Sequence, residues 1–270
     1  AQRAWPEAVE ALEDIVSRRN GTSRVQAEIK QVAERRAPSK AAPKKTGDKA
    51  MSKLKEFTAS SARPLPVLLL ADVSGSMSTN GKIDALNDAV QEMLESFGGE
   101  DDSRAEIHVS VVTFGKDGAK VHQPLAPAAK VQWTRMTAAG GTPMGAAFDA
   151  VTGMIEDRAQ VPSRAYRPTI ILVSDGQPTD EWQAPLKRLL GAERASKAAR
   201  FALGIGDDAD EAMLSAFLAT PEARVYRAHE ARQIKQFFRW VTMSVTQRSR
   251  SANPNSVIAA EPTDLDDFNF

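Results

Sequence analysis

Apolar residues in the middle of the chain follow two spacings. Short continuous apolar runs are typical of strands buried on both faces, and stripes at every third or fourth position are typical of amphipathic helices. The predicted strands cover residues 67–72, 106–114, 120–125, 169–174, 200–205 and 224–227. The predicted helices cover residues 83–97, 143–157, 182–190, 208–217 and 234–245.

This alternation of strands and helices predicts an α/β fold. Buried strands separated by amphipathic helices indicate a mainly parallel sheet covered by helices on both faces. Right-handed crossovers then give a doubly wound sandwich, with the segment 120–125 expected as a short edge strand. Asp208 and Glu211 have the spacing of a capping pair, and Thr142-Pro143 is a favourable start for the helix that follows.

Polarity divides the chain into three predicted parts. Residues 1–62 carry two short helical patterns, with Trp5 as an apolar anchor, and then a basic Pro- and Lys-rich linker. Residues 63–247 form the α/β domain, and residues 248–270 form an acidic tail. Helices this short are not stable alone, so we expect the N-terminal pair to dock on this domain, on a second copy, or on a partner.

The composition narrows the possible functions. Lys and Arg number 35, as do Asp and Glu, so the formal net charge is zero and no nucleic acid or membrane partner is expected. Cysteine is absent, which excludes disulfides, thiolate metal sites and cysteine nucleophiles. The longest apolar run, 67–71, is too short to span a bilayer, and the first ten residues lack a signal-peptide pattern. A cytoplasmic protein is the expectation.

Oxygen-bearing side chains follow two of the predicted buried strands. The first strand ends in Asp72-Val73-Ser74-Gly75-Ser76, which places one carboxylate and two hydroxyls at alternate positions. Thr142 follows a Gly-Gly pair just before a helix, and Asp175 comes directly after the strand 169–174. In a doubly wound sheet these loops share one edge, and ligands bind at that edge.

Two carboxylates and three hydroxyls are hard oxygen donors that suit Mg²⁺, or Mn²⁺ as a substitute, rather than zinc. Five donors leave one position of an octahedron, which favours a carboxylate from a partner. Each segment alone also fits an ordinary turn or helix cap, so the prediction depends on their conjunction. The predicted metal ligands are Asp72, Ser74, Ser76, Thr142 and Asp175.

These segments resemble the metal-ion-dependent adhesion site (MIDAS) of the von Willebrand factor A (vWA) family, and the resemblance covers about residues 63–247. All five predicted ligands match the family pattern. Within the family, the chain is most similar to the bacterial tellurium-resistance TerY type. The matching segments are Ser76-Met77, Ile83-Asp84-Ala85-Leu86-Asn87, Asp175-Gly176-Gln177-Pro178-Thr179-Asp180 with Trp182, and Phe237-Phe238-Arg239-Trp240-Val241.

The resemblance implies a scaffold or sensor that works with a protein Ser/Thr kinase and a PP2C-type phosphatase in stress resistance or phage defence. We expect a Mg²⁺-dependent protein-binding module and not an enzyme, because no Gly-x-Ser-x-Gly elbow or phosphate loop occurs. One alternative is a structural metal, with partners bound through helices in residues 5–36. Another is a metal-dependent phosphoester hydrolase. The acidic tail is interpreted as a solubilising end, with Asp264, Asp266 or Asp267 as an alternative source of the sixth ligand.

Overall fold

The computed structural model describes residues 62–100, 104–220 and 223–256. The predicted N-terminal helices, the basic linker and the tail from residue 257 onward lie outside the described residues. The strands of the described part are β1 (Arg63–Asp72), β2 (Ala105–Gly115), β3 (Gly118–Pro127), β4 (Thr169–Ser174), β5 (Ala199–Ile205) and β6 (Tyr226–Ala228). The α-helices are α4 (Lys82–Gly98), α5 (Met144–Glu156), α6 (Gln183–Gly191), α7 (Glu211–Leu218) and α8 (Ala231–Arg250).

The strands form one sheet in the order β3-β2-β1-β4-β5-β6. Every neighbouring pair is parallel except β2 and β3, which are antiparallel. The predicted mainly parallel, doubly wound α/β fold is therefore confirmed, with the segment 120–125 inside the edge strand β3. Because the chain moves outward from β1 to β3 and then returns to β4, the strand order reverses between β1 and β4, the place where such sheets bind ligands.

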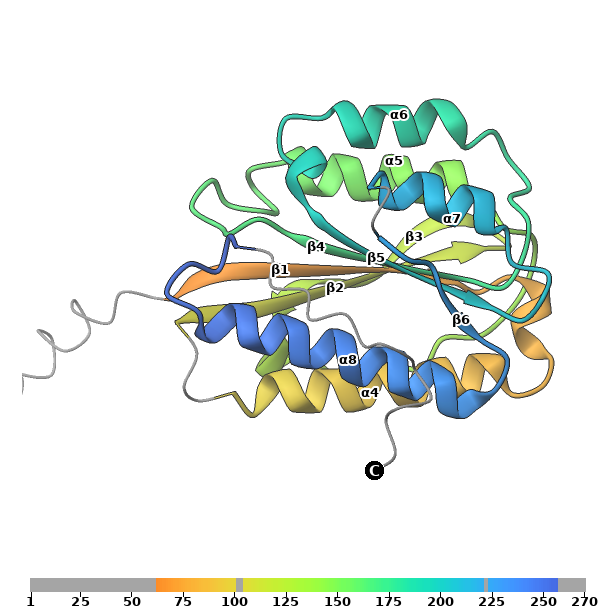
Figure 1. Cartoon of the computed structure of the whole chain (residues 1–270), viewed down its shortest axis with the longest axis horizontal. Coiled ribbons are helices and arrows are strands. Elements are labelled where there is room, and N and C mark those ends of the chain that lie inside the picture. The colour runs from red at the N-terminus through yellow and green to blue at the C-terminus, as the bar shows by residue number, and fades with distance from the viewer. Residues whose placement is uncertain (1–61, 101–103, 221–222, 257–270) are drawn as a thin grey trace, which may run out of the picture. The chain divides into compact units, whose positions relative to one another are not determined.

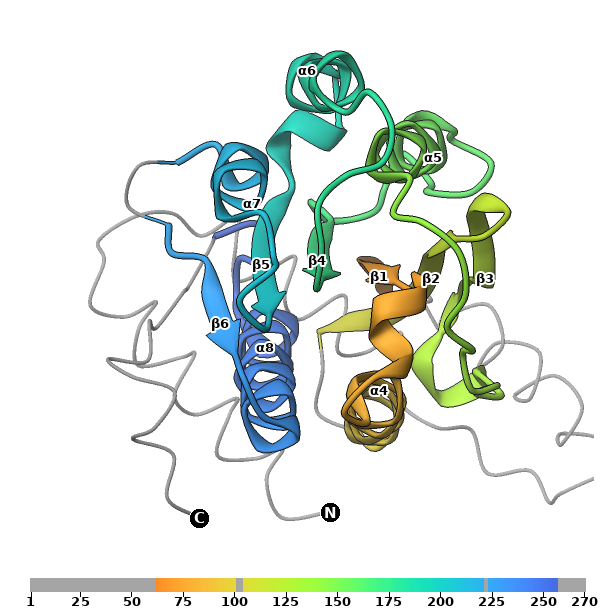
Figure 2. The same cartoon turned by 90° about the vertical axis from the view of Figure 1, so that its right-hand side faces the viewer.

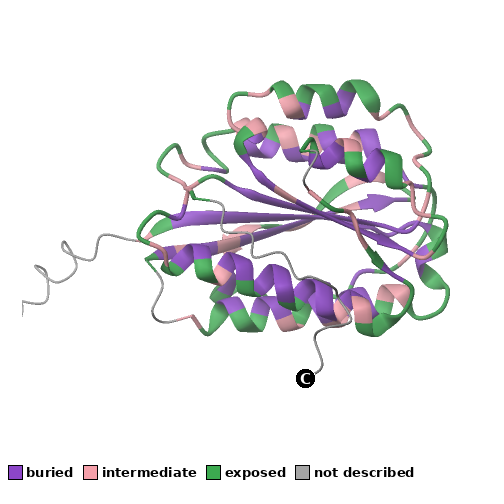
Figure 3. Cartoon of the chain, in the orientation of Figure 1, coloured by how far each residue is buried: buried purple, intermediate pink, exposed green. Residues whose placement is uncertain are grey.

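Helices cover both faces of the sheet (Figures 1 and 2). Helices α4 and α8 pack on one face, and α5, α6 and α7 pack on the other. Successive side chains of β1 point to opposite faces, so Leu69 lies in the first core whereas Leu68 and Leu70 lie in the second. The central strands are accordingly buried along almost their whole length (Figure 3), which explains their continuous apolar sequence.

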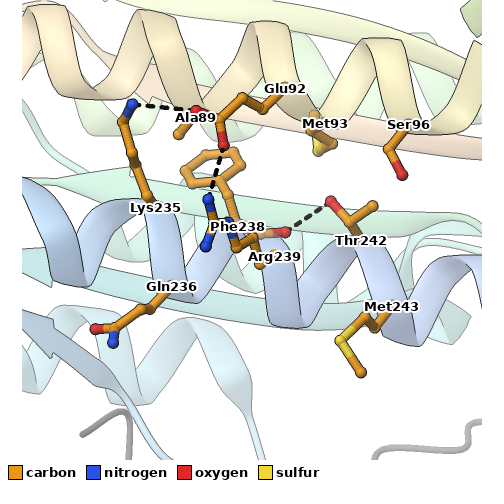
Figure 4. Close-up of a pocket in the computed structure, with 10 residues that line it drawn as sticks. All are labelled: Ala89, Glu92, Met93, Ser96, Lys235, Gln236, Phe238, Arg239, Thr242 and Met243. Atoms are coloured by element: carbon orange, nitrogen blue, oxygen red, sulfur yellow. Dashed lines mark hydrogen bonds and ion pairs between the residues drawn. The ribbon is translucent and has the colours of Figure 1, made fainter. Parts of the chain in front are cut away.

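The contact between α4 and α8 combines an apolar centre with surface ion pairs (Figure 4). Phe238 of α8 is 1% exposed and belongs to the core under both helices. At the surface, Lys235 and Arg239 of α8 lie 3.1 and 3.7 Å from Glu92 of α4. Exposed ion pairs contribute about 1 kcal/mol or less, so the buried phenylalanine stabilises this helix pair more than the charges do.

Two helix ends differ from the sequence prediction. Helix α7 is capped by Asp210, whose Oδ1 accepts a hydrogen bond from the Met213 backbone N–H at 2.9 Å. The prediction that Asp208 caps this helix is therefore wrong. Asp208 lies two residues too early, because the helix begins only at Glu211. Helix α8 continues to Arg250, past the predicted start of the tail at residue 248.

The end of α8 is fixed to the domain by a buried arginine. Arg248 is 2% exposed, and its guanidinium donates hydrogen bonds to Thr169 Oγ1 at 2.6 Å and to the carbonyls of Arg167 and Pro254. Burial lowers the pKa of Arg248 to about 10. The segment after α8 thus returns to the sheet at least as far as Pro254. None of the described helices is long and apolar enough to cross a membrane.

Candidate metal centre

Three loops meet at the carboxyl edge of the sheet, next to the β1–β4 reversal. Figure 2 is viewed from this edge. The loop after β1 is joined to the loop before α5 by two backbone hydrogen bonds, from Gly75 N to Gly140 O at 2.8 Å and from Ala139 N to Val73 O at 2.7 Å. These bonds fix the first two of the predicted site segments side by side.

Asp72 forms the floor of the site at the end of β1. Its side chain is fully buried, and its two oxygens accept hydrogen bonds from Ser74 N at 2.8 Å and from Ser174 Oγ at 2.6 Å. Burial raises the pKa of the Asp72 carboxyl above its usual value, and the hydrogen bonds from Ser174 and Ser74 oppose that rise. A nearby cation would favour the ionised carboxylate, and each oxygen keeps a second lone pair for it.

Asp175 brings the end of β4 to the same place. Its Oδ1 accepts a hydrogen bond from Ser76 Oγ at 2.7 Å and lies 3.5 Å from Ser74 Oγ. The two serine hydroxyls are 3.0 Å apart. Asp175 and Ser74 are buried whereas Ser76 is exposed. The site is therefore open to solvent on the side of Ser76.

Thr142 approaches the site from the third loop. Its backbone N–H donates to Thr179 Oγ1 at 3.0 Å, and its carbonyl accepts from Thr179 N at 2.9 Å. A Cβ placed on Gly176 would lie 3.7 Å from Thr142 Oγ1 and 3.9 Å from Ser76 Oγ. The two hydroxyls therefore face the same glycine, and the structure brings all three sequence segments together.

Helix α5 starts next to Thr142-Pro143, as predicted, but the Thr142 side chain does not cap it. Helix α5 begins at Met144 with Pro143 at the N-cap position, and two of its first N–H groups are capped by Asp180. The two Asp180 oxygens accept hydrogen bonds from Gly145 N at 2.9 Å and Ala146 N at 3.0 Å. Asp180 thus supplies the cap, and it fixes the helix start next to the site.

The sequence prediction missed two further polar residues around the site. Lys82, the first residue of α4, places its Nζ 2.7 Å from Asp175 Oδ2. Buried Asn87 pairs with both the N–H and the carbonyl of Met136, which ties the segment before Thr142 to α4. A polar Asn on the apolar face of the predicted helix indicates a buried hydrogen-bonding role for Asn87. Nothing in the sequence indicates that Lys82 contacts the site.

The residues present fit a hard divalent cation. The oxygens of Ser74, Ser76 and Asp175 lie within 3.5 Å of one another, Asp72 binds the Ser74 backbone, and Thr142 faces Gly176 together with Ser76. The ammonium of Lys82 already pairs with Asp175. Within the described ranges, no group of three or more His, Cys, Asp or Glu side chains is close enough to hold a metal. The donor set therefore depends on hydroxyls, which suit Mg²⁺ or Mn²⁺. The role of these five residues as ligands stays a prediction.

Comparison with known proteins agrees with this fold. The sequence model of the von Willebrand factor type A domain matches residues 67–240. No curated protein matches the chain significantly. Among solved structures, a von Willebrand factor type A protein from Catenulispora acidiphila is 24% identical with a TM-score of 0.52, and the match covers 68% of this chain and 42% of that one.

Two other structures share the fold at lower identity. The pilus adhesin SpaC from Lactobacillus rhamnosus GG is 17% identical, with a TM-score of 0.57 and coverage of 70% of this chain and 31% of that one. Proximal thread matrix protein 1 from the mussel byssus, with zinc in its MIDAS motif, is 18% identical, with a TM-score of 0.51 and coverage of 67% and 47%. The chain spans less than half the length of each of these three proteins. With its matching family model and its doubly wound sheet, the chain belongs to the von Willebrand factor type A domain family.

Proposed function

We propose that the chain is a metal-dependent protein-binding module. In this proposal Asp72, Ser74, Ser76, Thr142 and Asp175 hold a divalent cation, and an Asp or Glu of a partner protein completes its coordination. One observation carries it: Ser76 Oγ and Asp175 Oδ1 are 2.7 Å apart although they are separated by 99 positions in the sequence. The loops that follow β1 and β4 thus place side-chain oxygens next to each other.

Mg²⁺ is the cation we propose, with Mn²⁺ as a substitute. When bound, the cation supplies a concentrated positive charge that can accept an outside carboxylate. Three of the five donors are neutral hydroxyls, so the site itself provides only two compensating charges. The zinc in the MIDAS motif of the mussel byssus protein supports a divalent cation at the matching place here, whereas the absence of Cys and His from the donor set favours a harder ion.

Binding, and not catalysis, is the proposed role. Each of the three histidines pairs with a residue outside the donor set, which supports this view. His108 lies 2.6 Å from Glu106, His122 lies 2.7 Å from the Thr134 carbonyl, and His229 lies 3.4 Å from Asp207. A hydrolytic reaction at the site would need a general base within reach of the substrate.

The wider context rests on sequence motifs. The segments shared with the TerY type, including Ser76-Met77 and 237–241, support a role in bacterial stress resistance or phage defence. We propose a protein Ser/Thr kinase and a PP2C-type phosphatase as partners, in the cytoplasm. The zero formal net charge is consistent with a protein partner and not with nucleic acid.

Thermal melting with and without Mg²⁺ tests the metal site. A ligand at 100 times its Kd stabilises by about 2.7 kcal/mol, which raises the Tm of a domain of this size by about 5–10 °C. Asp72→Ala should abolish this rise. The control Asp149→Ala, which removes only an exposed pair with Arg188, should keep it. An unchanged melting curve of the parent chain at saturating Mg²⁺ would contradict the proposal.

Affinity capture with and without EDTA tests the partner role. The proposal expects a bound protein to be lost both in EDTA and with Asp175→Ala. If the metal is structural and partners bind through the N-terminal residues, capture should survive EDTA under conditions where the chain stays folded. Turnover of phosphoester substrates that depends on Mg²⁺ and on Asp72 would instead establish an enzyme.

A further inference from the structure

A lysine reaches into the site that we propose holds the metal. Lys82 Nζ donates a hydrogen bond to Asp175 Oδ2 at 2.7 Å, while Asp175 Oδ1 accepts from Ser76. The Asp175 side chain is fully buried, and the Lys82 side chain is only 17% exposed. The contact joins residues 93 positions apart, so this is a largely buried ion pair and not a flexible surface contact.

The position of Lys82 is not explained by helix stability. Lys82 is the first residue of α4, and a helix N-terminus carries a partial positive charge that disfavours a cation. Asp84 in the same turn has the sign that stabilises this helix end. The favourable interaction of the ammonium is instead with Asp175, on a different loop.

A second environment for the ammonium lies beside the site. Lys82 lines a pocket of about 640 Å³ together with Asp207, Asp208 and His229. His229 Nδ1 lies 3.4 Å from Asp207 Oδ1. Gly206 forms part of this wall, and a Cβ placed on it would lie 3.6 Å from Lys82 Nζ. A long, flexible lysine can therefore leave Asp175 and still remain next to carboxylates.

We propose that Lys82 and the divalent cation compete for Asp175. In the metal-free protein the ammonium neutralises the buried carboxylate and keeps the β1 and β4 loops assembled. When the cation binds, Lys82 moves toward the pocket that contains Asp207 and Asp208. Lys82 thereby lowers the affinity of the site for the metal, so that a higher cation concentration is needed to fill it. This inference rests on the proposed metal site and adds its regulation.

Titration calorimetry with MgCl₂ and melting in EDTA test the competition. Lys82→Met removes the competing charge at one ligand, so Mg²⁺ should bind about tenfold more tightly. The same variant leaves Asp175 buried without its cation, so its Tm in EDTA should fall by about 5–10 °C. Lys82→Arg keeps the charge and should stay within about threefold of the parent affinity. As a control, Lys120→Met removes an exposed pair with Asp117 and should change neither quantity.

The outcomes separate this inference from the proposed function. If Mg²⁺ binds the parent chain and binds Lys82→Met equally or more weakly, competition is wrong and the metal site stands. If Lys82→Met binds Mg²⁺ and the parent does not, Lys82 blocks the site, and the proposed metal-dependent function of the parent chain is wrong. If neither chain binds Mg²⁺ or Mn²⁺, both proposals are wrong. A purely structural role for Lys82 predicts weaker metal binding in Lys82→Met, which is the opposite sign.

Discussion

Asp180 is expected to stabilise the start of α5, and with it the Thr142 side of the site. Its carboxylate accepts hydrogen bonds from Gly145 N at 2.9 Å and Ala146 N at 3.0 Å. Loss of a capping side chain costs about 1 kcal/mol, and loss of a negative charge at a helix N-terminus costs up to about 1 kcal/mol more. Asp180→Ala should therefore lower the free energy of unfolding by about 2 kcal/mol.

Thermal and urea melts measure this change. A cost of about 2 kcal/mol corresponds to a fall in Tm of about 4–8 °C. Asp180→Asn keeps one oxygen acceptor without the charge and should lose about half as much. Asp149→Ala, on the exposed side of the same helix, removes a surface pair with Arg188 and should cost less than about 1 kcal/mol. Equal melting of Asp180→Ala and Asp149→Ala would refute the assigned cap.

Three further substitutions in α4 and α5 are tested by chemical denaturation. Asn87→Ala breaks two hydrogen bonds to buried Met136 and should cost about 2–4 kcal/mol, with weaker Mg²⁺ binding; a cost below 1 kcal/mol would count against its tie to the Thr142 loop. Gly145→Ala places a Cβ in a clash with the Glu181 carbonyl oxygen and should destabilise by about 1–3 kcal/mol. In the same helix Gly153 has open space, so Gly153→Ala should stabilise by about 0.5–1 kcal/mol, and equal effects of the two would contradict this packing.

Much of the fold could be predicted because its strands are buried on both faces. The continuous apolar runs at 67–71 and 170–173 have no other simple interpretation once amphipathic helices separate them. The same pattern predicts where each strand ends. Because the ends of parallel strands share one edge of the sheet, it also predicts that Asp72 and Asp175 lie at the same edge. The structure brings these two residues together through Ser74 and Ser76.

Contacts that depend on the path of the loops could not be predicted. Thr142-Pro143 has a good local sequence for a helix start, yet Asp180, from a loop 35 positions away, caps that helix. Asp208 and Asp210 are both capping residue types, and only the backbone geometry selects Asp210. The ion pair of Lys82 with Asp175 joins the start of α4 to the loop after β4, and these two segments meet only in the completed sheet.

The central claim is that five oxygen-bearing side chains hold one divalent cation at the carboxyl edge of the sheet. Anomalous X-ray scattering from crystals grown with Mn²⁺ tests this claim most directly. The account predicts one strong peak between the β1 and β4 loops, in bonding contact with oxygens of this set, that is lost in Asp72→Ala. A Mn²⁺ peak only elsewhere on the chain, or none at saturating Mn²⁺, would contradict it.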